Sequence, residues 1–502
     1  MNSSKQIRLG ALLSYTNITV NIILGLVYTP WMIHSIGREN YGLYILATSV
    51  ITLFVFDFGL SAAVTRFVAK YIAEGNNEKA NNVIGLVYRL YFVIDAVLLV
   101  LLVGIYFFIP QIYQELTPEE VEKFKVVYVI AASYSVAAFP FIPIGGIISA
   151  YEKFVQLRLC DLAHKLIKVG LMTGCLLLGY GLYALVIVNA IAGVITILLK
   201  LYVIYRYTPQ KPNFSYRNKH EFRQVISYSG WTTVIAIAGR LILKLAPSIL
   251  GIYSGSAAIA ILGVAITIDS YTYMFASAIS GMFLPRVSRI VAHEKGNVLP
   301  LLNKVGRLQL MVVGAIVVGF ACLGHDFILL WVGEKFEESY LCTLILVAAM
   351  LYTTPHEIAN QNVYAQNKVK EMGLIHLGSS LFNVVLYFVL AKPFGPLGIA
   401  IAVFVSLVIR TVLMEIMYYK KLAIDIIAFL KETFLKIGSA LIGAYLLYLA
   451  FDVVLGHKLF ILTWSSFAIK SIVFMAIYAA CVCFILNDYE KSLFKSMIGR
   501  ML

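Results

Sequence analysis

Long runs of apolar residues, separated by short polar segments, dominate the pattern of this chain. Runs such as residues 11–33 and 41–64 exceed the roughly 20 residues that a helix needs to cross the hydrocarbon of a bilayer. Buried β-strands are only about four to eight residues long. The pattern therefore predicts membrane-spanning α-helices and argues against a β core.

Hydropathy along the chain predicts fourteen membrane-spanning helices. They cover approximately residues 9–33, 41–65, 81–109, 125–150, 158–178, 181–205, 222–250, 256–284, 303–324, 339–364, 371–391, 395–419, 428–455 and 463–486. The first run begins near Leu9 and is too long for the core of a signal peptide, and no small-residue cleavage site follows it. We therefore expect it to stay in the protein as the first span.

Composition supports this interpretation, because 61% of the residues are hydrophobic and only 13% are charged. A soluble globular protein has about 25% charged residues, so this chain lacks the polar surface to face water on every side. The six cysteines lie mostly inside apolar runs and show no metal-ligand spacing, which predicts small packing residues. The predicted fold class is an all-α integral membrane protein.

The positions of the 40 Lys and Arg residues predict the orientation of the helices. With a cytoplasmic N-terminus, 28 of them fall in cytoplasmic segments, among them Arg158, Lys165, Arg286 and Arg307. Six fall in outer segments and six within spans. This excess follows the positive-inside rule and predicts that both termini are cytoplasmic. The net charge of +14 then faces anionic lipid, so no nucleic-acid partner is needed to explain it.

The predicted outer loops are short. The longest, around residues 111–125, contains Thr117, Pro118 and Glu120, which form an N-cap, a proline in the first turn and a capping-box glutamate. These residues predict the start of the fourth helix within that loop. No outer loop is large enough for a catalytic domain.

The two halves of the chain repeat each other at a spacing of 213 to 220 residues. The matched pairs are Ser14 and Ser227, Tyr15 and Tyr228, Pro30 and Pro247, Arg66 and Arg286, Ala150 and Ala365, Lys153 and Lys368, Gly179 and Gly395, and Ala184 and Ala400. Six spans per half is an even number, so the halves have the same orientation. We predict two six-helix lobes, residues 1–220 and 221–422, around a central cleft, followed by two further helices in residues 423–502.

Charged residues within the first lobe are candidates for function, because each charge at mid-membrane costs a few kcal/mol. Asp57 and Arg89 lie at similar predicted depths, which leaves open a structural ion pair or a role in transport. Asp95 is one to two turns deeper, with no evident partner in the sequence. Lys200 and, in the last span, Lys470 are expected to extend toward the membrane surface.

Arg240 and Lys244 in the second lobe are four residues apart, which places them on one face of a helix. Asp269 on the next span lies at a depth close to that of Arg240 and could neutralise it. Arg410 lies near the middle of the twelfth span, with Glu415 nearer the cytoplasm on a different face.

A cleft with more cations than anions suits an anionic ligand, and the arginine fork is well matched to phosphate. The alternative, that these charges pair among themselves, stays open. Asp57, Asp95 and Asp269 could instead bind a coupling proton or sodium ion. The sequence predicts no other cofactor. It contains no Walker A loop, dinucleotide fingerprint or nucleophile elbow, and His356–Glu357 lacks the second histidine of a metal motif.

Three segments resemble the polysaccharide (oligosaccharide) flippases of the multidrug/oligosaccharidyl-lipid/polysaccharide exporter superfamily. They are Gly-Arg-Glu-Asn-Tyr-Gly-Leu-Tyr at residues 37–44, Asp-Phe-Gly-Leu at 57–60 and Arg-Phe-Val-Ala-Lys-Tyr at 66–71. The resemblance implies two lobes that open alternately to either side of a bacterial inner membrane. It also implies a role in lipopolysaccharide or capsule biosynthesis, and no enzymatic activity.

The substrate that the resemblance implies is an undecaprenyl-diphosphate-linked oligosaccharide. In related flippases a cationic cavity receives the diphosphate, and Arg240, Lys244, Arg89 and Arg410 match that role in kind and depth. Membrane lipids are expected partners, and polysaccharide assembly proteins are further candidates.

Three other functions stay open at this stage. An ion-coupled multidrug exporter of the same superfamily would take an organic cation, against which the excess of Arg and Lys within the spans argues. A polysaccharide polymerase or ligase would need a substantial outer loop with catalytic Arg or His. A membrane scaffold without transport activity would not need charges at mid-membrane.

Overall fold

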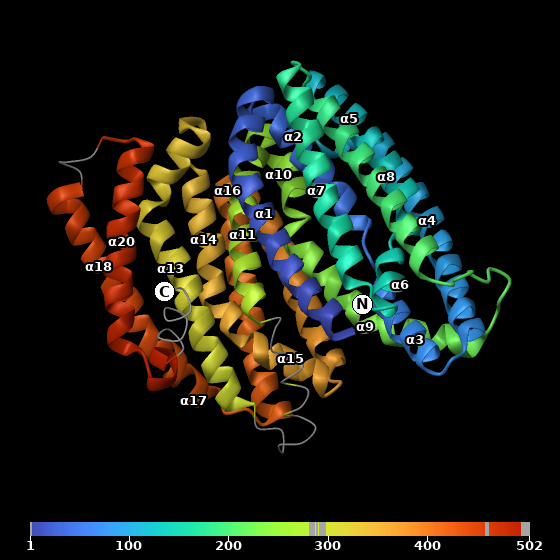
Figure 1. Cartoon of the computed structure of the whole chain (residues 1–502). Helices are drawn as coiled ribbons and strands as arrows, with labels where there is room; N and C mark the ends of the chain where they lie inside the picture. The colour runs from blue at the N-terminus through green and yellow to red at the C-terminus, as the bar shows by residue number, and fades with distance from the viewer. Residues whose placement is uncertain (1–2, 281–286, 288–289, 291–297, 457–460, 493–502) are drawn as a thin grey trace. The chain divides into compact units, whose positions relative to one another are not determined.

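The computed structural model describes residues 3–280, 287, 290, 298–456 and 461–492, and these are almost entirely helical, with no strand (Figure 1). Eleven helices in these ranges are long and apolar enough to cross a membrane. The predicted all-α, multi-pass membrane fold is confirmed. Several cytoplasmic cations of the sequence prediction lie outside the described residues: Arg286, Arg289, Lys295, Lys495 and Arg500.

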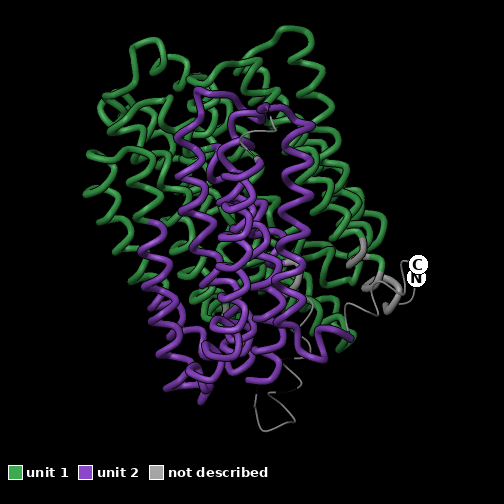
Figure 2. The backbone as a smooth tube through the Cα atoms, turned by 90° about the vertical axis from the view of Figure 1, so that its left-hand side faces the viewer, with its two compact units in different colours: residues 1–263, 376–402 green, residues 264–375, 403–502 purple. Residues whose placement is uncertain are grey.

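The described chain forms two compact units, coloured green and purple in Figure 2. Unit 1 contains residues 1–263 and 376–402, and unit 2 contains residues 264–375 and 403–502. Within each unit, the residues pack mainly against one another. The predicted division into lobes of residues 1–220 and 221–422 rests on the internal repeat, and it stays a prediction.

Unit 1 is built mainly from the first ten helices. They are α1 (Ser3–Ile36), α2 (Arg38–Phe54), α3 (Leu60–Ala73), α4 (Asn77–Ile112), α5 (Pro118–Ala138), α6 (Ile144–Ala150), α7 (Phe154–Leu177), α8 (Leu182–Tyr207), α9 (Lys219–Leu243) and α10 (Ala246–Tyr253), with the short η1 (Phe139–Phe141). A core of buried side chains centred on Val68, Val87 and Tyr91 joins α3 and α4.

Unit 2 contains most of the later helices. They are α13 (Leu299–Val332), α14 (Ser339–Thr353), α15 (Glu357–Ala365), α17 (Ile426–Leu430), α18 (Lys436–Phe451) and α20 (Trp464–Ile485), with the short η2 (Glu334–Phe336), η3 (Thr354–His356), η4 (Lys431–Leu435) and η5 (Asp452–Gly456). Two long helices, α11 (Gly255–Ser280) and α16 (Val369–Leu422), belong partly to each unit. Leu310, Leu441 and Phe474 lie in a core that joins α13, α18 and α20.

Two predicted spans are absent from the eleven long apolar helices. Residues 158–177 form most of α7, whose first 15 residues include four charged ones, so this part is less apolar than the neighbouring helices. Residues 41–65 do not form one helix, because the chain leaves the helical conformation between α2 and α3. The number of membrane crossings therefore stays a prediction.

The break between α2 and α3 has a specific cause in the sequence. Gly59 adopts a left-handed conformation, with φ of 70°, which only glycine takes readily. The Asp57 carboxylate then accepts a hydrogen bond from the Ser61 amide (3.1 Å), the role of a helix N-cap, and another from the Tyr91 hydroxyl (2.7 Å). Asp57 therefore has a structural role at the start of α3.

Hydroxyl groups of α9 satisfy the backbone of this break. Thr233 donates to the Phe58 carbonyl (2.6 Å), and Ser229 donates to the Gly59 carbonyl (3.4 Å). Irregular backbone within a membrane is tolerated only where other protein groups satisfy it. Contacts with α9 thus allow the chain to bend at a place where hydropathy predicts a continuous helix.

A second break divides α16, which has 54 residues and would be about 80 Å long if it were straight. Gly395, between Pro393 and Pro396, has φ of 53° and ψ of −131°, outside the helical region. A Cβ atom on Gly398 would touch the carbonyl of Leu390, which a continuous helix would hold about 12 Å away. The chain therefore turns here, between the predicted spans 371–391 and 395–419.

The capping box predicted at Thr117 is present. The Thr117 hydroxyl accepts from the Glu120 amide (3.3 Å), and the Glu120 carboxylate accepts from the Thr117 amide (2.8 Å). Pro118 begins α5, as the sequence indicated.

Candidate functional site

Arg240, a predicted phosphate-binding cation, contacts a backbone carbonyl and an aromatic ring. Its guanidinium donates to the carbonyl of Thr52, in the last turn of α2, and lies 4.4 Å from the centre of the Phe56 ring. The last four carbonyls of a helix have no partner within the helix, and the C-terminal end carries partial negative charge. Arg240 thus caps α2, and among the described ion pairs no carboxylate neutralises it.

Lys244 lies four residues further on, where α9 has just ended at Leu243. The Ser49 hydroxyl of α2 donates to the Lys244 carbonyl, so α2 contacts the end of α9 at both predicted cations. Pro247 in the first turn of α10 explains why the predicted span 222–250 is divided here.

Arg89, Asp57 and Asp95 are the other predicted site residues of unit 1, and each has different neighbours. Arg89 donates to the backbone carbonyl of Tyr216 (2.9 Å), while Asp57 binds Tyr91. These two charges therefore have different partners, rather than the ion pair that the sequence left open. One carboxylate oxygen of Asp95 is buried and has no hydrogen-bond partner within the described structure.

In unit 2, Arg410 on α16 lies within electrostatic range of the Glu357 carboxylate and the Tyr418 hydroxyl. A carboxylate therefore offsets part of the Arg410 charge within its own unit. Asp269 is buried on α11, also in unit 2, whereas Arg240 belongs to unit 1. The predicted neutralisation of Arg240 by Asp269 stays a prediction, as do the substrate and ion-coupling roles of all seven predicted residues.

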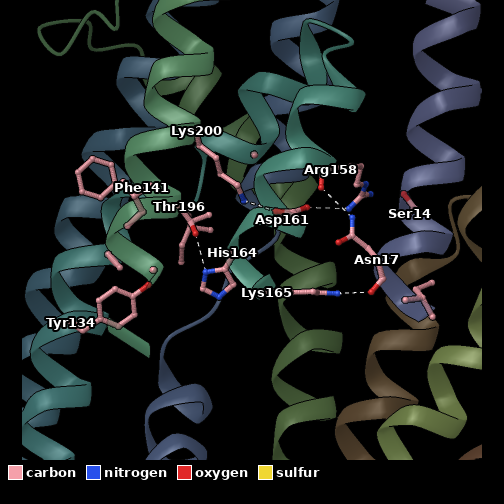
Figure 3. Close-up of a pocket in the computed structure, with 16 residues that line it drawn as sticks. Ser14, Asn17, Tyr134, Phe141, Arg158, Asp161, His164, Lys165, Thr196 and Lys200 are labelled. Carbon is pink, nitrogen blue, oxygen red and sulfur yellow. Dashed lines mark hydrogen bonds and ion pairs between the residues drawn. The ribbon is translucent and has the colours of Figure 1, made fainter. Parts of the chain in front are cut away.

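Unit 1 contains a pocket that the sequence did not predict. It has a volume of about 730 Å³ and lies among α1, α5, α7 and α8 (Figure 3). Its polar lining consists of Ser14, Asn17, Tyr134, Arg158, Asp161, His164, Lys165, Thr196 and Lys200. None of the seven predicted site residues is part of this lining.

Charged side chains form a connected row along the pocket. The Asp161 carboxylate contacts Lys200 at 2.9 Å and Arg158 at 3.4 Å, as the dashed lines in Figure 3 show. Lys165 donates to the backbone carbonyl of Asn17 (2.8 Å), and the Asn17 side chain donates to the Arg158 carbonyl (3.1 Å). These contacts hold α1, α7 and α8 around the cavity.

The pocket has an excess of positive charge. Arg158, Lys165 and Lys200 are cations, and Asp161 is the one carboxylate of the lining. The Nδ1 atom of His164 lies 2.8 Å from the Thr196 hydroxyl, which donates its own proton to a backbone carbonyl. Nδ1 is therefore the donor in this hydrogen bond, and a neutral imidazole ring can make it. The lining therefore carries a net charge of +2 with His164 neutral, which suits an anionic group.

Sequence reasoning missed this pocket for an identifiable reason. It assigned Arg158 and Lys165 to a cytoplasmic segment and expected Lys200 to extend to the membrane surface. A usable signal was present, because Arg158, Asp161 and Lys165 follow one another at spacings of three and four, on one face of a helix. The described residues contain no cluster of His, Cys, Asp or Glu suited to a metal ion.

Comparison with solved structures identifies the class of fold. The lipid II flippase MurJ in an inward closed conformation matches with a TM-score of 0.72 and 15% identity, covering 97% of this chain and 99% of that one. A multidrug transporter of the MATE family in an inward-facing conformation matches with a TM-score of 0.61 and 14% identity, over 81% of this chain and 97% of that one. The chain thus has the transporter fold of the multidrug/oligosaccharidyl-lipid/polysaccharide exporter superfamily.

Sequence comparison then identifies the family. The pattern of the family described as "Polysaccharide biosynthesis protein" matches residues 9–291, more than half of the chain, and the chain belongs to this family. Stage V sporulation protein B of Bacillus subtilis is 24% identical, over 81% of this chain and 82% of its own length. The probable low-salt glycan biosynthesis flippase Agl15 of Haloferax volcanii is 22% identical, over 41% of this chain and 42% of its own length. The predicted resemblance is confirmed, and the matching solved structures are those of a flippase and a transporter rather than of enzymes.

Proposed function

We propose that this protein is a flippase that moves an undecaprenyl-diphosphate-linked oligosaccharide from the cytoplasmic to the outer leaflet of a bacterial inner membrane. Its two lobes would open alternately to either side, with both termini in the cytoplasm. The observation that carries the proposal is the positively charged pocket of unit 1, whose lining holds Arg158, Lys165 and Lys200 against Asp161.

The excess of positive charge in this pocket favours an anionic substrate over a neutral one. Cations within a membrane protein are costly unless an anion or a hydrogen-bond acceptor offsets them. A phosphate or diphosphate supplies several charged oxygen acceptors to Lys and Arg at once, in charge-assisted hydrogen bonds. Asp161 can offset only one of the three cations, so a phosphate group completes the lining better than any neutral head group.

The similar proteins also support a lipid-linked substrate. MurJ is a lipid II flippase, Agl15 is a probable glycan biosynthesis flippase, and the family is named for polysaccharide biosynthesis. A multidrug exporter remains the second candidate, because transporters of that kind share the fold. An organic cation would meet like charge in this pocket, which favours the lipid-linked substrate.

The first test neutralises two cations of the pocket. Wild-type protein and the variant Lys165→Gln/Lys200→Gln are reconstituted into liposomes, and transbilayer movement of a fluorescent undecaprenyl-diphosphate oligosaccharide is measured. We expect the double substitution to slow movement about tenfold or more, because even one lost charge-assisted contact is worth about 1.5–3 kcal/mol and about 1.4 kcal/mol is a factor of ten.

A matched control tests whether the effect comes from the pocket or from the overall net charge of the protein. Lys123→Gln/Lys125→Gln removes two lysines that pair with Glu119 and Glu122 near the start of α5, away from the pocket lining. This variant should move the probe at the wild-type rate. Equal rates for wild type and the pocket variant, with both proteins folded, would show that these two cations of the pocket do not contribute to transport.

A further inference from the structure

A second buried polar cluster, in unit 2, has no part in the function proposed so far. His356 ends η3, and its Nε2 atom lies 2.8 Å from one carboxylate oxygen of Glu415 on α16. The other oxygen of Glu415 accepts from the Tyr352 hydroxyl (2.8 Å) on α14. The His356 and Glu415 side chains are only 2% and 11% exposed. From the sequence, His356 lacked the second histidine of a metal motif, and Glu415 was expected nearer the cytoplasm than Arg410, on a different face.

The hydrogen bonds of His356 determine how many protons the cluster holds. Its Nδ1 atom lies 2.8 Å from the Tyr352 backbone carbonyl, which can only accept, so Nδ1 carries a proton. The short contact between Nε2 and Glu415 then needs a second proton. That proton lies either on Nε2, giving an imidazolium beside a carboxylate, or on Glu415, giving two neutral groups.

Without this second proton, the contact would be repulsive. A Glu415 carboxylate would face the lone pair of Nε2 at 2.8 Å, in a site almost closed to water. Burial of unsatisfied and charged groups is costly, so such a pair would separate. The arrangement in the structure is therefore the proton-loaded form of the site.

Aromatic rings enclose the site. The His356 ring lies 5.0 Å from Phe429 of α17, 6.0 Å from Phe434 of η4 and 6.4 Å from Tyr418 of α16, measured between ring centres. Rings on three elements keep water from the imidazole and hold it in place. A proton that leaves must therefore follow a movement of these elements.

The other ionisable groups near the site have partners of their own. The Glu357 carboxylate on α15 accepts from Asn360 and Gln361, at 3.2 Å each. The Tyr418 hydroxyl donates to the Asn360 side chain (2.7 Å). Arg307 on α13, Arg410 on α16, and Lys431 and Glu432 on η4 are further charged groups on these and neighbouring elements. Arg307 is bound to Glu490, and Glu432 to Lys436.

We propose that His356 and Glu415 form a proton-binding site whose loading drives transport by this protein. When loaded, the shared proton joins α16 to η3 and α14. When the proton leaves to water, a Glu415 carboxylate faces the unprotonated Nε2 atom in either case, the bond to His356 breaks, and α16 is free to move against α14. The coupling part of this proposal rests on the proposed flippase function, whereas proton binding does not.

Proton binding is tested first on the purified protein, without any substrate. Infrared difference spectra between acidic and basic buffer are recorded for wild type, Glu415→Gln and His356→Asn. We expect a pH-dependent band of a carboxyl group or an imidazole ring in wild type that both variants lack. Glu415→Gln keeps the shape of a protonated glutamate, and its amide can donate to Nε2, so this variant should fold as wild type does.

The chain offers a matched control on its surface. His325 and Glu337 form a similar pair at 3.0 Å, but their side chains are 47% and 64% exposed. Glu337→Gln should keep the wild-type band that Glu415→Gln loses. Identical spectra for wild type and Glu415→Gln would overturn the proton site.

Coupling is tested in liposomes with and without an imposed pH gradient. Wild type should move the lipid-linked probe several times faster with the gradient, whereas Glu415→Gln should move it at one slow rate in both conditions. Full stimulation of Glu415→Gln by the gradient would overturn coupling through this site. If wild type moves no probe at all, the flippase function fails, and the infrared spectra still decide whether the proton site exists.

Discussion

Replacing Glu490 with alanine is expected to lower the stability of the protein by about 3–5 kcal/mol, the usual cost of removing one partner of a buried ion pair. Arg307 and Glu490 form two parallel hydrogen bonds, of 2.6 and 2.8 Å, and both side chains are only 4% exposed. The substitution leaves the guanidinium buried without its counter-charge.

The position of Arg307 explains why this effect should spread through unit 2. Its Nη1 atom donates to the carbonyl of Glu432 (2.9 Å), and Nη2, which also binds Glu490, donates to the carbonyl of Ile485 (3.1 Å). One side chain of α13 thus holds η4, the end of α20 and the segment that follows α20. Loss of Glu490 should loosen all three attachments.

Thermal unfolding in detergent measures this prediction. Glu432→Ala is the control, because Glu432 forms an exposed pair with Lys436 on one helix face, and such pairs contribute little. Arg307→Met/Glu490→Met should be more stable than Glu490→Ala, since it leaves no buried charge unpaired. A Glu490→Ala protein that melts with wild type would show that the pair does not stabilise unit 2.

Reversing the charge of Lys200 should have the largest effect on transport. Lys200→Glu would place a second carboxylate beside Asp161, whose present distance to Lys200 is 2.9 Å. The two negative charges would repel each other and any phosphate in the pocket. The net charge of the lining would fall from +2 to zero, so we expect movement of the diphosphate-linked probe to drop by about 100-fold.

A charge swap tests whether electrostatics is the cause. In Asp161→Lys/Lys200→Glu the two residues can pair again, and the lining recovers its net charge of +2. This variant should recover a large part of the transport that Lys200→Glu loses. The measurement is again probe movement in liposomes, with equal amounts of folded protein. A swap variant as inactive as Lys200→Glu would indicate that geometry, rather than charge, governs the pocket.

Local patterns in the sequence predicted the fold well. The apolar runs indicated the helices, and Thr117 with Pro118 indicated the start of α5, because a helix start depends on residues close together in the chain. The break at Asp57 and Gly59 was not foreseen. It is stabilised by hydroxyl groups of α9, about 170 residues away, and hydropathy gives no sign of them.

The candidate sites depend on contacts between distant residues, so the sequence could not predict them as units. Lys200 meets Asp161 only because α7 and α8 pack side by side, and His356 meets Glu415 across 59 residues. Arg307 was expected in a cytoplasmic segment, and it is buried against Glu490. The types of residue could be read from the sequence, but their partners could not.

Recognition of the diphosphate by the pocket is tested by comparing two probes in liposomes that contain wild-type protein. Both carry the same fluorescent oligosaccharide, one on undecaprenyl diphosphate and one on an uncharged undecaprenyl ether. A flippase that recognises its substrate through the positively charged pocket should move the diphosphate probe much faster than the uncharged one. Equal movement of the two probes, or movement of neither while a fluorescent organic cation is exported, would contradict this account.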